Sequence, residues 1–188
     1  MSDRVVIDER RTPSPVMRPA RSDDAAAIAS VHIASSDDAY APLAGTWPQA
    51  DHSARTALWA ESLSGRTFVL VAEDTDGAVI GFVSGGAARR PETAVELELY
   101  VIHVLPGHRN RGVGSALWRA ACRDLRGVEL APMYLDTLAE LACSSFYERH
   151  GGEVVERRPM DFHGAERTHV TYRWSQGASS EAIDSPTR

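Results

Sequence analysis

Two arginines and two glycines fall within six residues, 109–114, between an apolar stretch and a helical pattern. Residues 99–105 are rich in β-branched side chains, which predicts a buried strand that Pro106 ends. Apolar residues then recur at helical spacing up to about Arg126. The N–H groups at a helix start lack intrahelical partners, and the helix dipole adds about half a positive charge there. The sequence therefore predicts a site for a phosphate or a similar anion, assisted by Arg109 and Arg111.

Two phosphate-binding motifs with a similar outline do not fit this spacing. A P-loop needs Lys and then Ser or Thr where Val113 and Gly114 stand, so nucleotide hydrolysis is not expected. A dinucleotide-binding fingerprint needs a third glycine where Leu117 stands, and its strand opens a domain rather than coming late in the chain. The loop taken alone leaves one alternative open, an ordinary strand–turn–helix with a glycine-rich corner.

Composition narrows the class of protein. A length of 188 residues suits one domain with its own core. The formal net charge of −6 argues against a nucleic-acid binder, which would usually be basic. No apolar run reaches the length of a membrane span, and the charged N-terminus lacks the apolar core of a signal peptide. We therefore expect a cytoplasmic protein without a membrane partner. Cys122 and Cys143 lie far apart and the histidines lack metal-ligand spacing, so neither a disulfide framework nor a metal site is predicted.

The patterns along the chain predict one α/β domain at residues 15–175, between disordered tails at 1–14 and 176–188. Strands are expected at residues 15–20, 67–73, 78–84, 94–105, 132–137, 154–161 and 168–174. Helices are expected at residues 22–35, 51–63, from the glycine-rich loop to about 126, and 140–150. Hairpins in the first half and a βαβ unit in the second predict a mixed sheet.

Residues 36–50 are expected to form an irregular loop between the first two helices. This segment carries Asp37, Asp38, Tyr40 and Trp47, and loops of this size are often functional. The alternative is that its aromatic side chains only cover the edge of the core.

Three segments resemble the GCN5-related N-acetyltransferase (GNAT) family. Arg109-x-x-Gly112-x-Gly114 is similar to the loop of that family that binds the pyrophosphate of acyl-coenzyme A. The stretch 98–106 is similar to the strand that leads into the loop, and residues 146–151 are similar to the family's Phe-Tyr-Glu-x-x-Gly segment. The order of elements matches over nearly all of residues 15–175. The resemblance implies a mixed, mostly antiparallel sheet of six to seven strands flanked by about four helices.

The resemblance also implies acetyl-coenzyme A (acetyl-CoA) as co-substrate. Its expected contacts lie on the strand end, on the loop and on the last helix. They are Ile102, His103, Val104, Arg109, Asn110, Arg111, Gly112, Val113, Gly114, Ser115, Glu140 and Ser144. Glu140 departs from the family, which usually carries Asn there, and a carboxylate offers no hydrogen-bond donor for that contact.

Acetyl transfer to an amine sets two proton requirements. An alkylamine with a pKa of about 10.4 is mostly protonated at neutral pH, so a proton acceptor is needed. Glu98 matches the family's strand position and Glu96 shares its face, and either is expected as the base; the alternative is a solvated or ion-paired residue. Tyr147 is the expected proton donor to the leaving thiolate, the alternative being a core aromatic. A main-chain N–H of residues 102–104 is the expected donor to the carbonyl oxygen.

The function that follows is acetyl-CoA-dependent N-acetylation of a small primary amine, by direct attack in a ternary complex. The acceptor could be amino-acid-like, a polyamine or an antibiotic, with its ammonium group oriented by Asp37, Asp38 and Tyr40. One alternative is acetylation of a peptide or protein, and another is a non-catalytic sensor that binds coenzyme A. Exposed strands near the C-terminus could pair between two copies and form a homodimer.

Overall fold

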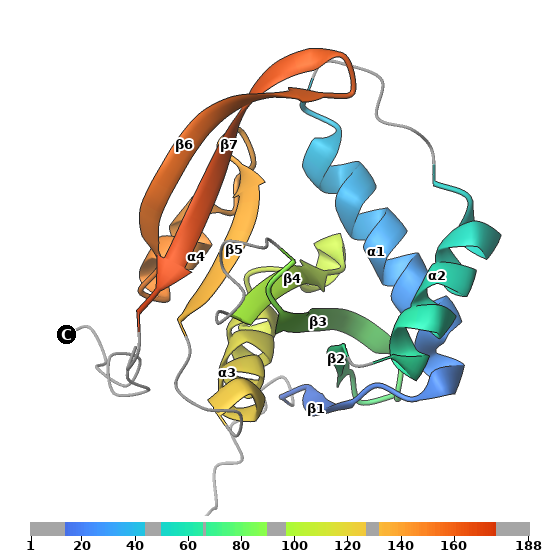
Figure 1. Ribbon diagram of the computed structural model, residues 1–188. Helices are drawn as coiled ribbons and strands as arrows, with labels where there is room; N and C mark the ends of the chain where they lie inside the picture. The colour runs from blue at the N-terminus through green and yellow to red at the C-terminus, as the bar shows by residue number, and fades with distance from the viewer. Residues whose placement is uncertain (1–13, 44–49, 66, 90–96, 127–131, 176–188) are drawn as a thin grey trace, which may run out of the picture.

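The computed structural model describes residues 14–43, 50–65, 67–89, 97–126 and 132–175 (Figure 1). Its strands are β1 Val16–Pro19, β2 Phe68–Glu73, β3 Val79–Ala87, β4 Leu97–Val104, β5 Met133–Leu138, β6 Glu153–Phe162 and β7 Ala165–Trp174. Its helices are α1 Ala25–Tyr40, α2 His52–Ser64, α3 Val113–Arg126 and α4 Ser144–Arg149, with short 3-10 turns η1 Ser22–Asp24 and η3 Pro106–His108. Apart from Ser14, the predicted tails lie outside the described residues.

The seven strands form one sheet in the order β1-β2-β3-β4-β5-β7-β6, and every neighbouring pair is antiparallel except β4 and β5. This confirms the predicted mixed, mostly antiparallel sheet flanked by helices. The first strand is an edge strand. None of the helices in the described part of the chain is both long and apolar enough to cross a membrane.

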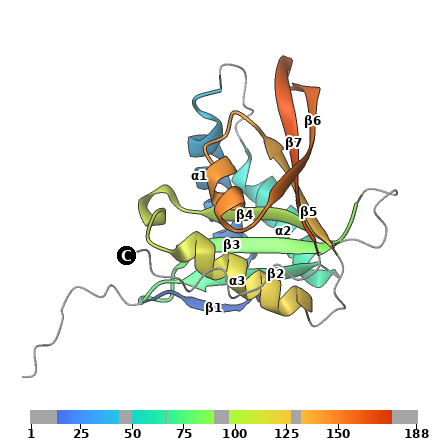
Figure 2. The same cartoon turned by 90° about the vertical axis from the view of Figure 1, so that its left-hand side faces the viewer.

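Helices cover both faces of the sheet (Figures 1 and 2). On one face, α3 and α4 bury Leu117 and Tyr147 against strand residues such as Leu99 and Tyr172. On the other face, α1 and α2 bury Ile28 and Trp59 with strand residues that include Phe82. Removing this apolar surface from water is the main stabilising contribution to the fold.

Strand β4 contains a bulge that changes which face its side chains occupy. Ser84 of β3 lies opposite Val101 and Gly85 lies opposite Leu99, so Tyr100 is an extra residue on β4. In a regular strand Leu99 and Val101 would share a face. The bulge instead leaves Leu99 in the α3 core and sends Val101 to the core under α1 and α2.

Strands β4 and β5 separate soon after they meet. Their only backbone pairs in the described chain are Leu97 with Met133 and Glu98 with Tyr134. Both strands continue beyond these pairs, β4 to Val104 and β5 to Leu138. In the described chain, residues 102–104 of β4 are therefore not paired with a strand on their β5 side.

Two of the expected helix boundaries were wrong. Helix α1 continues to Tyr40, so residues 36–40 are helical rather than part of an irregular loop. The Ser and Asp residues there have weak helix propensity, but Ser35 and Ser36 are buried and Asp38 is ion-paired, and such tertiary contacts outweigh propensity. The last helix is shorter than predicted, because residues 139–143 form turns and α4 begins at Ser144.

The C-terminal hairpin is longer than predicted, since β6 and β7 meet through a two-residue turn. His163 and Gly164 have φ values of 53° and 80°, as a type I′ turn requires. The tip of this hairpin reaches back to α1 (Figure 1), where the Phe162 and Tyr40 rings stack with centroids 5.4 Å apart. The hairpin thus closes the molecule over the space between β5 and α1.

Candidate active site

The glycine-rich loop between η3 and α3 exposes main chain at the start of a helix. Asn110 and Gly112 have φ values of 59° and 82°, and a Cβ built on Gly112 would meet no atom within 4 Å. The Ala116 N–H donates to the Gly112 carbonyl at 2.9 Å, which begins the helix. The N–H groups of residues 113–115 precede the first possible intrahelical donor and point out of the helix end. This geometry fits a pyrophosphate, as the sequence predicted.

Gly114 is needed for a different reason. A Cβ at this position would lie 3.2 Å from Cε2 of Phe146, which is tight contact with the ring from α4. The glycine lets α4 pack against the start of α3, so the loop and the Phe-Tyr-Glu segment meet. Of the other predicted loop residues, Arg111 is exposed, Val113 is buried in the core and Ser115 is half-buried.

Arg109 does not extend freely from the loop, because its guanidinium is held by protein groups. Nε donates to the Val104 carbonyl and Nη2 donates to both the carbonyl and Oγ of Ser35, each at 3.2 Å. Nη1 forms an ion pair with Asp38. Arg109 therefore ties the loop to the last turns of α1. Its direct contact with an anion stays a prediction.

The three predicted acceptor residues lie in the final turn of α1 instead of in a loop. Asp38 is engaged by Arg109, as described. Tyr40 stacks on Phe162, and its burial raises the pKa of its hydroxyl. Asp37 accepts the Ala41 N–H through its main-chain carbonyl, which ends the helix. Their role toward an ammonium group stays a prediction.

Tyr147 lies on α4 with its side chain buried among aromatic rings. Its ring centroid is 5.5 Å from that of Phe146 and 5.3 Å from that of Tyr172. Burial raises the pKa of Tyr147 well above its ordinary value, with the neighbouring Cys143 adding to the effect. The hydroxyl is therefore protonated across the physiological range, which is the state a proton donor needs.

Glu98 is the most enclosed carboxylate of the site. It is 3% exposed and accepts four hydrogen bonds, three from Arg89 and one from Tyr134. Burial alone would raise its pKa, but the donors of Arg89 and Tyr134 outweigh burial and hold the pKa of Glu98 below its usual value. These contacts do not test its predicted role as the base. Glu96 lies outside the described residues.

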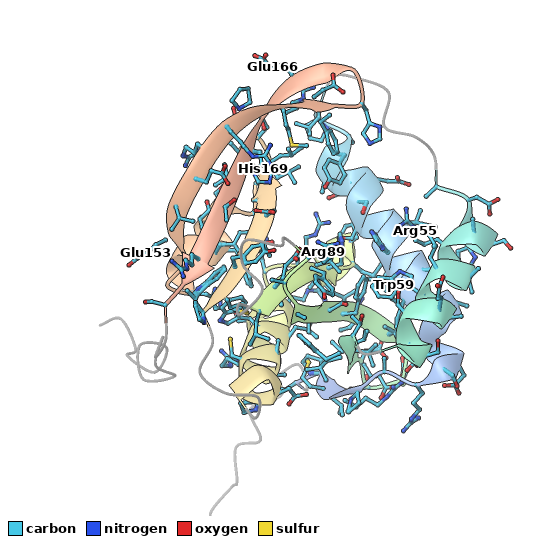
Figure 3. All side chains as sticks on the ribbon, viewed as in Figure 1. Arg55, Trp59, Arg89, Glu153, Glu166 and His169 are labelled. Carbon is cyan, nitrogen blue, oxygen red and sulfur yellow. The ribbon has the colours of Figure 1, made fainter. Side chains whose placement is uncertain are left out.

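His103 projects from β4 toward α1 and stacks on His32 with ring centroids 4.7 Å apart. Its Nδ1 lies 3.0 Å from Oγ of Ser35. Nδ1 of His32 accepts the indole N–H of Trp59, which is labelled in Figure 3, at 3.2 Å. Burial lowers the pKa of His103 to about 3 and that of His32 to about 4. Both rings are neutral at pH 7. The Arg109–Ser35–His103 contacts connect the loop, α1 and β4.

The remaining predicted contacts occupy the approach to the site. Ile102 and Val104 pack toward the α3 core, which leaves only their main chain to face the opening between β4 and β5. Glu140 accepts the Thr168 N–H of β7 at 3.0 Å, so its carboxylate is used inside the protein. Ser144 is the first residue of α4. No group of three or more metal-binding side chains occurs within the described ranges.

Sequence reasoning missed Ser35, Arg89, Tyr100 and Tyr134. Ser35 and Tyr134 are brought to the site by partners that are distant along the chain, as in the Ser35–His103 contact, which spans 68 positions. Arg89 and Tyr100 meet their partners through the pairing of β3 with β4. The alternation of apolar and charged residues at 97–99 could have indicated that Glu98 faces away from the α3 core. Its neighbour Tyr134 on β5 follows only from the pairing of the two strands.

Comparison with known proteins agrees with this geometry. Residues 31–152 match the model of the Acetyltransferase (GNAT) family. The uncharacterised N-acetyltransferase YuaI of Bacillus subtilis (strain 168) is 25% identical over 169 residues, which is 84% of this chain and 91% of YuaI. Mycothiol acetyltransferase of Salinispora tropica is 33% identical over 114 residues, covering 58% of this chain and 36% of that protein. The chain thus spans about a third of the latter's length.

Among solved structures, an N-acetyltransferase from Staphylococcus aureus Mu50 superposes with a TM-score of 0.71 at 17% identity, covering 87% of this chain and 99% of the other. This similarity supports the fold. The family match shows an acetyltransferase, whose co-substrate is acetyl-CoA, and the opened sheet and the glycine-rich loop fit this class. The chain belongs to the GNAT family.

Proposed function

We propose that the chain transfers the acetyl group of acetyl-CoA to the primary amine of a small molecule, by direct attack in a ternary complex. The observation that carries the proposal is the separation of β4 and β5 beyond Glu98 and Tyr134. The main chain of residues 102–104 borders this opening on the β4 side, and the glycine-rich loop follows it in the chain. An elongated cofactor and an acceptor can approach such an opening from opposite sides.

Each part of the opening has a role toward acetyl-CoA, which supplies the activated acyl group. The N–H groups of residues 113–115 would bind the pyrophosphate, and main-chain groups of residues 102–104 would hold the amide-containing arm and the carbonyl oxygen. Tyr147, kept protonated by burial, would donate a proton to the departing sulfur. The proton acceptor stays the prediction made from the sequence, Glu98 or Glu96.

A small acceptor is favoured over a peptide or protein by the closure of the acceptor side. The Tyr40–Phe162 stack joins α1 to the tip of the β6–β7 hairpin, and a closed boundary of this kind favours a compact acceptor over an extended peptide. The cytoplasmic location and the homodimer stay predictions.

The proposal is tested by release of free thiol from acetyl-CoA over a panel of amines. Tyr147→Phe should lower kcat at least about tenfold, the usual scale of acid catalysis, because the proton donor is lost while the ring remains. Tyr172→Phe is the matched control, since it removes a hydroxyl from the same aromatic core and should leave kcat within about twofold. A purely structural role of Tyr147 predicts equal rates in the two variants. A chain that binds coenzyme A tightly and acetylates no amine is a sensor instead of an enzyme.

A further inference from the structure

Arg89, which follows β3, is held in one orientation although it is a surface residue. Its Nε and Nη2 both donate to Oε1 of Glu98, and its main-chain N–H donates to Oε2 of the same carboxylate at 2.9 Å. Its Cζ lies 4.4 Å above the centre of the Tyr100 ring. An exposed arginine ordinarily samples many rotamers, so these contacts fix a guanidinium plane that would otherwise be mobile.

The support under Arg89 is itself fixed. The Tyr100 hydroxyl donates to the Ala87 carbonyl at 2.7 Å, and its ring lies across β3 where a Cβ on Gly86 would come within 2.9 Å of the hydroxyl oxygen. Tyr134 donates to Oε2 of Glu98 at 3.0 Å from β5. The bulge that puts Tyr100 on this face and the glycine that makes room for it are therefore parts of one arrangement.

Burying the Glu98 carboxylate costs stability, and the ion pair with Arg89 offsets little of that cost. The side chain of Arg89 is 65% exposed while that of Glu98 is 4% exposed. An ion pair with one solvent-exposed partner returns little stability, and desolvating a carboxylate is costly. We therefore interpret the contacts of Glu98 as a means of holding the Arg89 guanidinium in one orientation. With Nε and one side of Nη2 used, the Nη1–Nη2 edge can still form two parallel hydrogen bonds, and Nη1 has no hydrogen-bond partner in the described chain.

The position of Arg89 relates it to the reaction region. Glu98 and Tyr134 form the last backbone pair before β4 and β5 separate, so the group stands at the closed end of the opening. Leu97 and Leu99 pack under α3, so Glu98, the residue between them, points to the opposite face, which α1 and α2 cover. The guanidinium lies over Tyr100, two residues or about 7 Å along the strand from Ile102. An amino acid that is hydrogen-bonded at both ends spans such a separation.

We propose that Arg89 binds a carboxylate on the acceptor, and that Glu98 and Tyr100 are positioning residues that present the Nη1–Nη2 edge of Arg89 to it. The acceptor class is then an amino acid or another amine that carries a carboxylate a short distance from its amino group. The proposal rests on the proposed function, because it names the acceptor of that same reaction.

The experiment compares paired acceptors, the standard amino acids and their carboxamides, which keep the amine and lose the carboxylate. The wild-type protein should prefer the acids. Arg89→Lys keeps a positive charge beside Glu98, so the fold is preserved, but one ammonium group cannot serve Glu98 and a bidentate carboxylate together. We expect its KM for the best acid to rise about tenfold with kcat nearly unchanged, and its kcat/KM for the matching amide to stay within about twofold.

Arg123→Lys, at an exposed position of α3, is the matched control and should change neither ratio. Thermal protection by the acid in the presence of coenzyme A, measured without turnover, should be weakened in Arg89→Lys and intact in the control. An equal loss on acid and amide, or no loss on either, overturns the assignment of Arg89. Wild-type activity on the amides with none on the acids overturns it as well while leaving the proposed function intact. Absence of thiol release on every acceptor overturns the proposed function.

Glu98→Gln separates positioning from proton transfer. If Glu98 acts through Arg89, the variant should raise the KM for acids with an unchanged pH profile of kcat, and the amides should be little affected. If Glu98 is instead the base, kcat should fall on both acceptors of a pair and the acidic limb of the profile should disappear, which would contradict the positioning role.

Discussion

At the scale of single residues, the anion site depends on a backbone conformation that side chains disfavour. Gly112 has a φ of 82°, and holding alanine in that region costs about 1–2 kcal/mol. Gly112→Ala should therefore lower the Tm by about 2–8 °C and raise the Kd of coenzyme A at least about tenfold, because the main chain shifts where it meets the anion. Isothermal titration checks the Kd.

Gly107→Ala is the matched control for this change. Gly107 also has no atom within 4 Å of a built Cβ, but its φ is not in the positive region. Its alanine variant should bind coenzyme A as the wild-type protein does. Equal Kd values for the two alanine variants would show that the backbone conformation at Gly112 is not what binds the anion.

Residues that work through their immediate neighbours could be predicted from the sequence, and those that work through distant partners could not. The spacing of Gly112 and Gly114 is local, and the structure gives both the predicted place. Glu98 could be found as a strand carboxylate, but its four hydrogen bonds depend on Arg89 after β3 and Tyr134 on β5. Those neighbours are set by the sheet order and by the bulge at Tyr100, neither of which a single sequence displays.

At the scale of elements, α1 is coupled to the loop through Arg109. Ser35 and Asp38 lie three residues apart on one side of α1, and both contact the Arg109 guanidinium. Asp38→Ala should leave the Tm within about 4 °C, because its side chain is half exposed, and such pairs contribute at most about 1 kcal/mol. The Kd of coenzyme A should rise about two- to fivefold as the loop loses this anchor.

The control for this coupling is Asp124→Ala, which removes an exposed carboxylate from α3. It changes the net charge equally and should leave the Kd unaltered. If both variants weaken coenzyme A binding alike, general electrostatics rather than the anchoring of Arg109 accounts for the effect.

The elements with strong periodicity could be predicted, and their ends could not. Helix α1 was expected to stop at Ser35 because the next residues are poor helix formers, yet contacts with the loop and with β4 keep it helical to Tyr40. The β6–β7 hairpin is longer than its alternating pattern suggested, since its outer part packs against α1 through Phe162. In both cases the boundary is decided by tertiary contacts that become visible only in the fold.

At the scale of the whole molecule, the core under α1 and α2 contains two titratable rings. His32 and His103 stack on each other, and both lie beside Phe82, with ring centroids 5.9 and 5.4 Å from it. Burial is the main cause of their lowered pKa values, and the positive charges of Arg55 and Arg109 add to it. The folded protein therefore holds both rings in the neutral form, and their protonation at low pH should lower the free energy of unfolding.

The direction of this pH dependence follows from the pKa values. In the unfolded chain a histidine titrates near 6.5, whereas in the fold His32 and His103 titrate near 4 and 3. As pH falls below about 6.5 the unfolded chain binds protons that the folded chain does not, so the free energy of unfolding decreases by up to about 1.4 kcal/mol per pH unit for each ring. The lowered pKa of Glu98 adds a loss in the same direction only below about pH 4.5.

Urea denaturation at pH 7, 6 and 5 measures the histidine contribution before the carboxylates titrate. The free energy of unfolding of the wild-type protein should fall steadily over this range. In His32→Asn the amide oxygen can still accept the Trp59 N–H, but one titrating ring is gone, so the decrease between pH 6.5 and 5 should be less steep than in the wild-type protein. His52→Asn, an exposed histidine at the start of α2, is the control and should keep the wild-type slope. A slope in His32→Asn equal to that of the wild-type protein would show that the buried pair does not set the acid sensitivity of the fold.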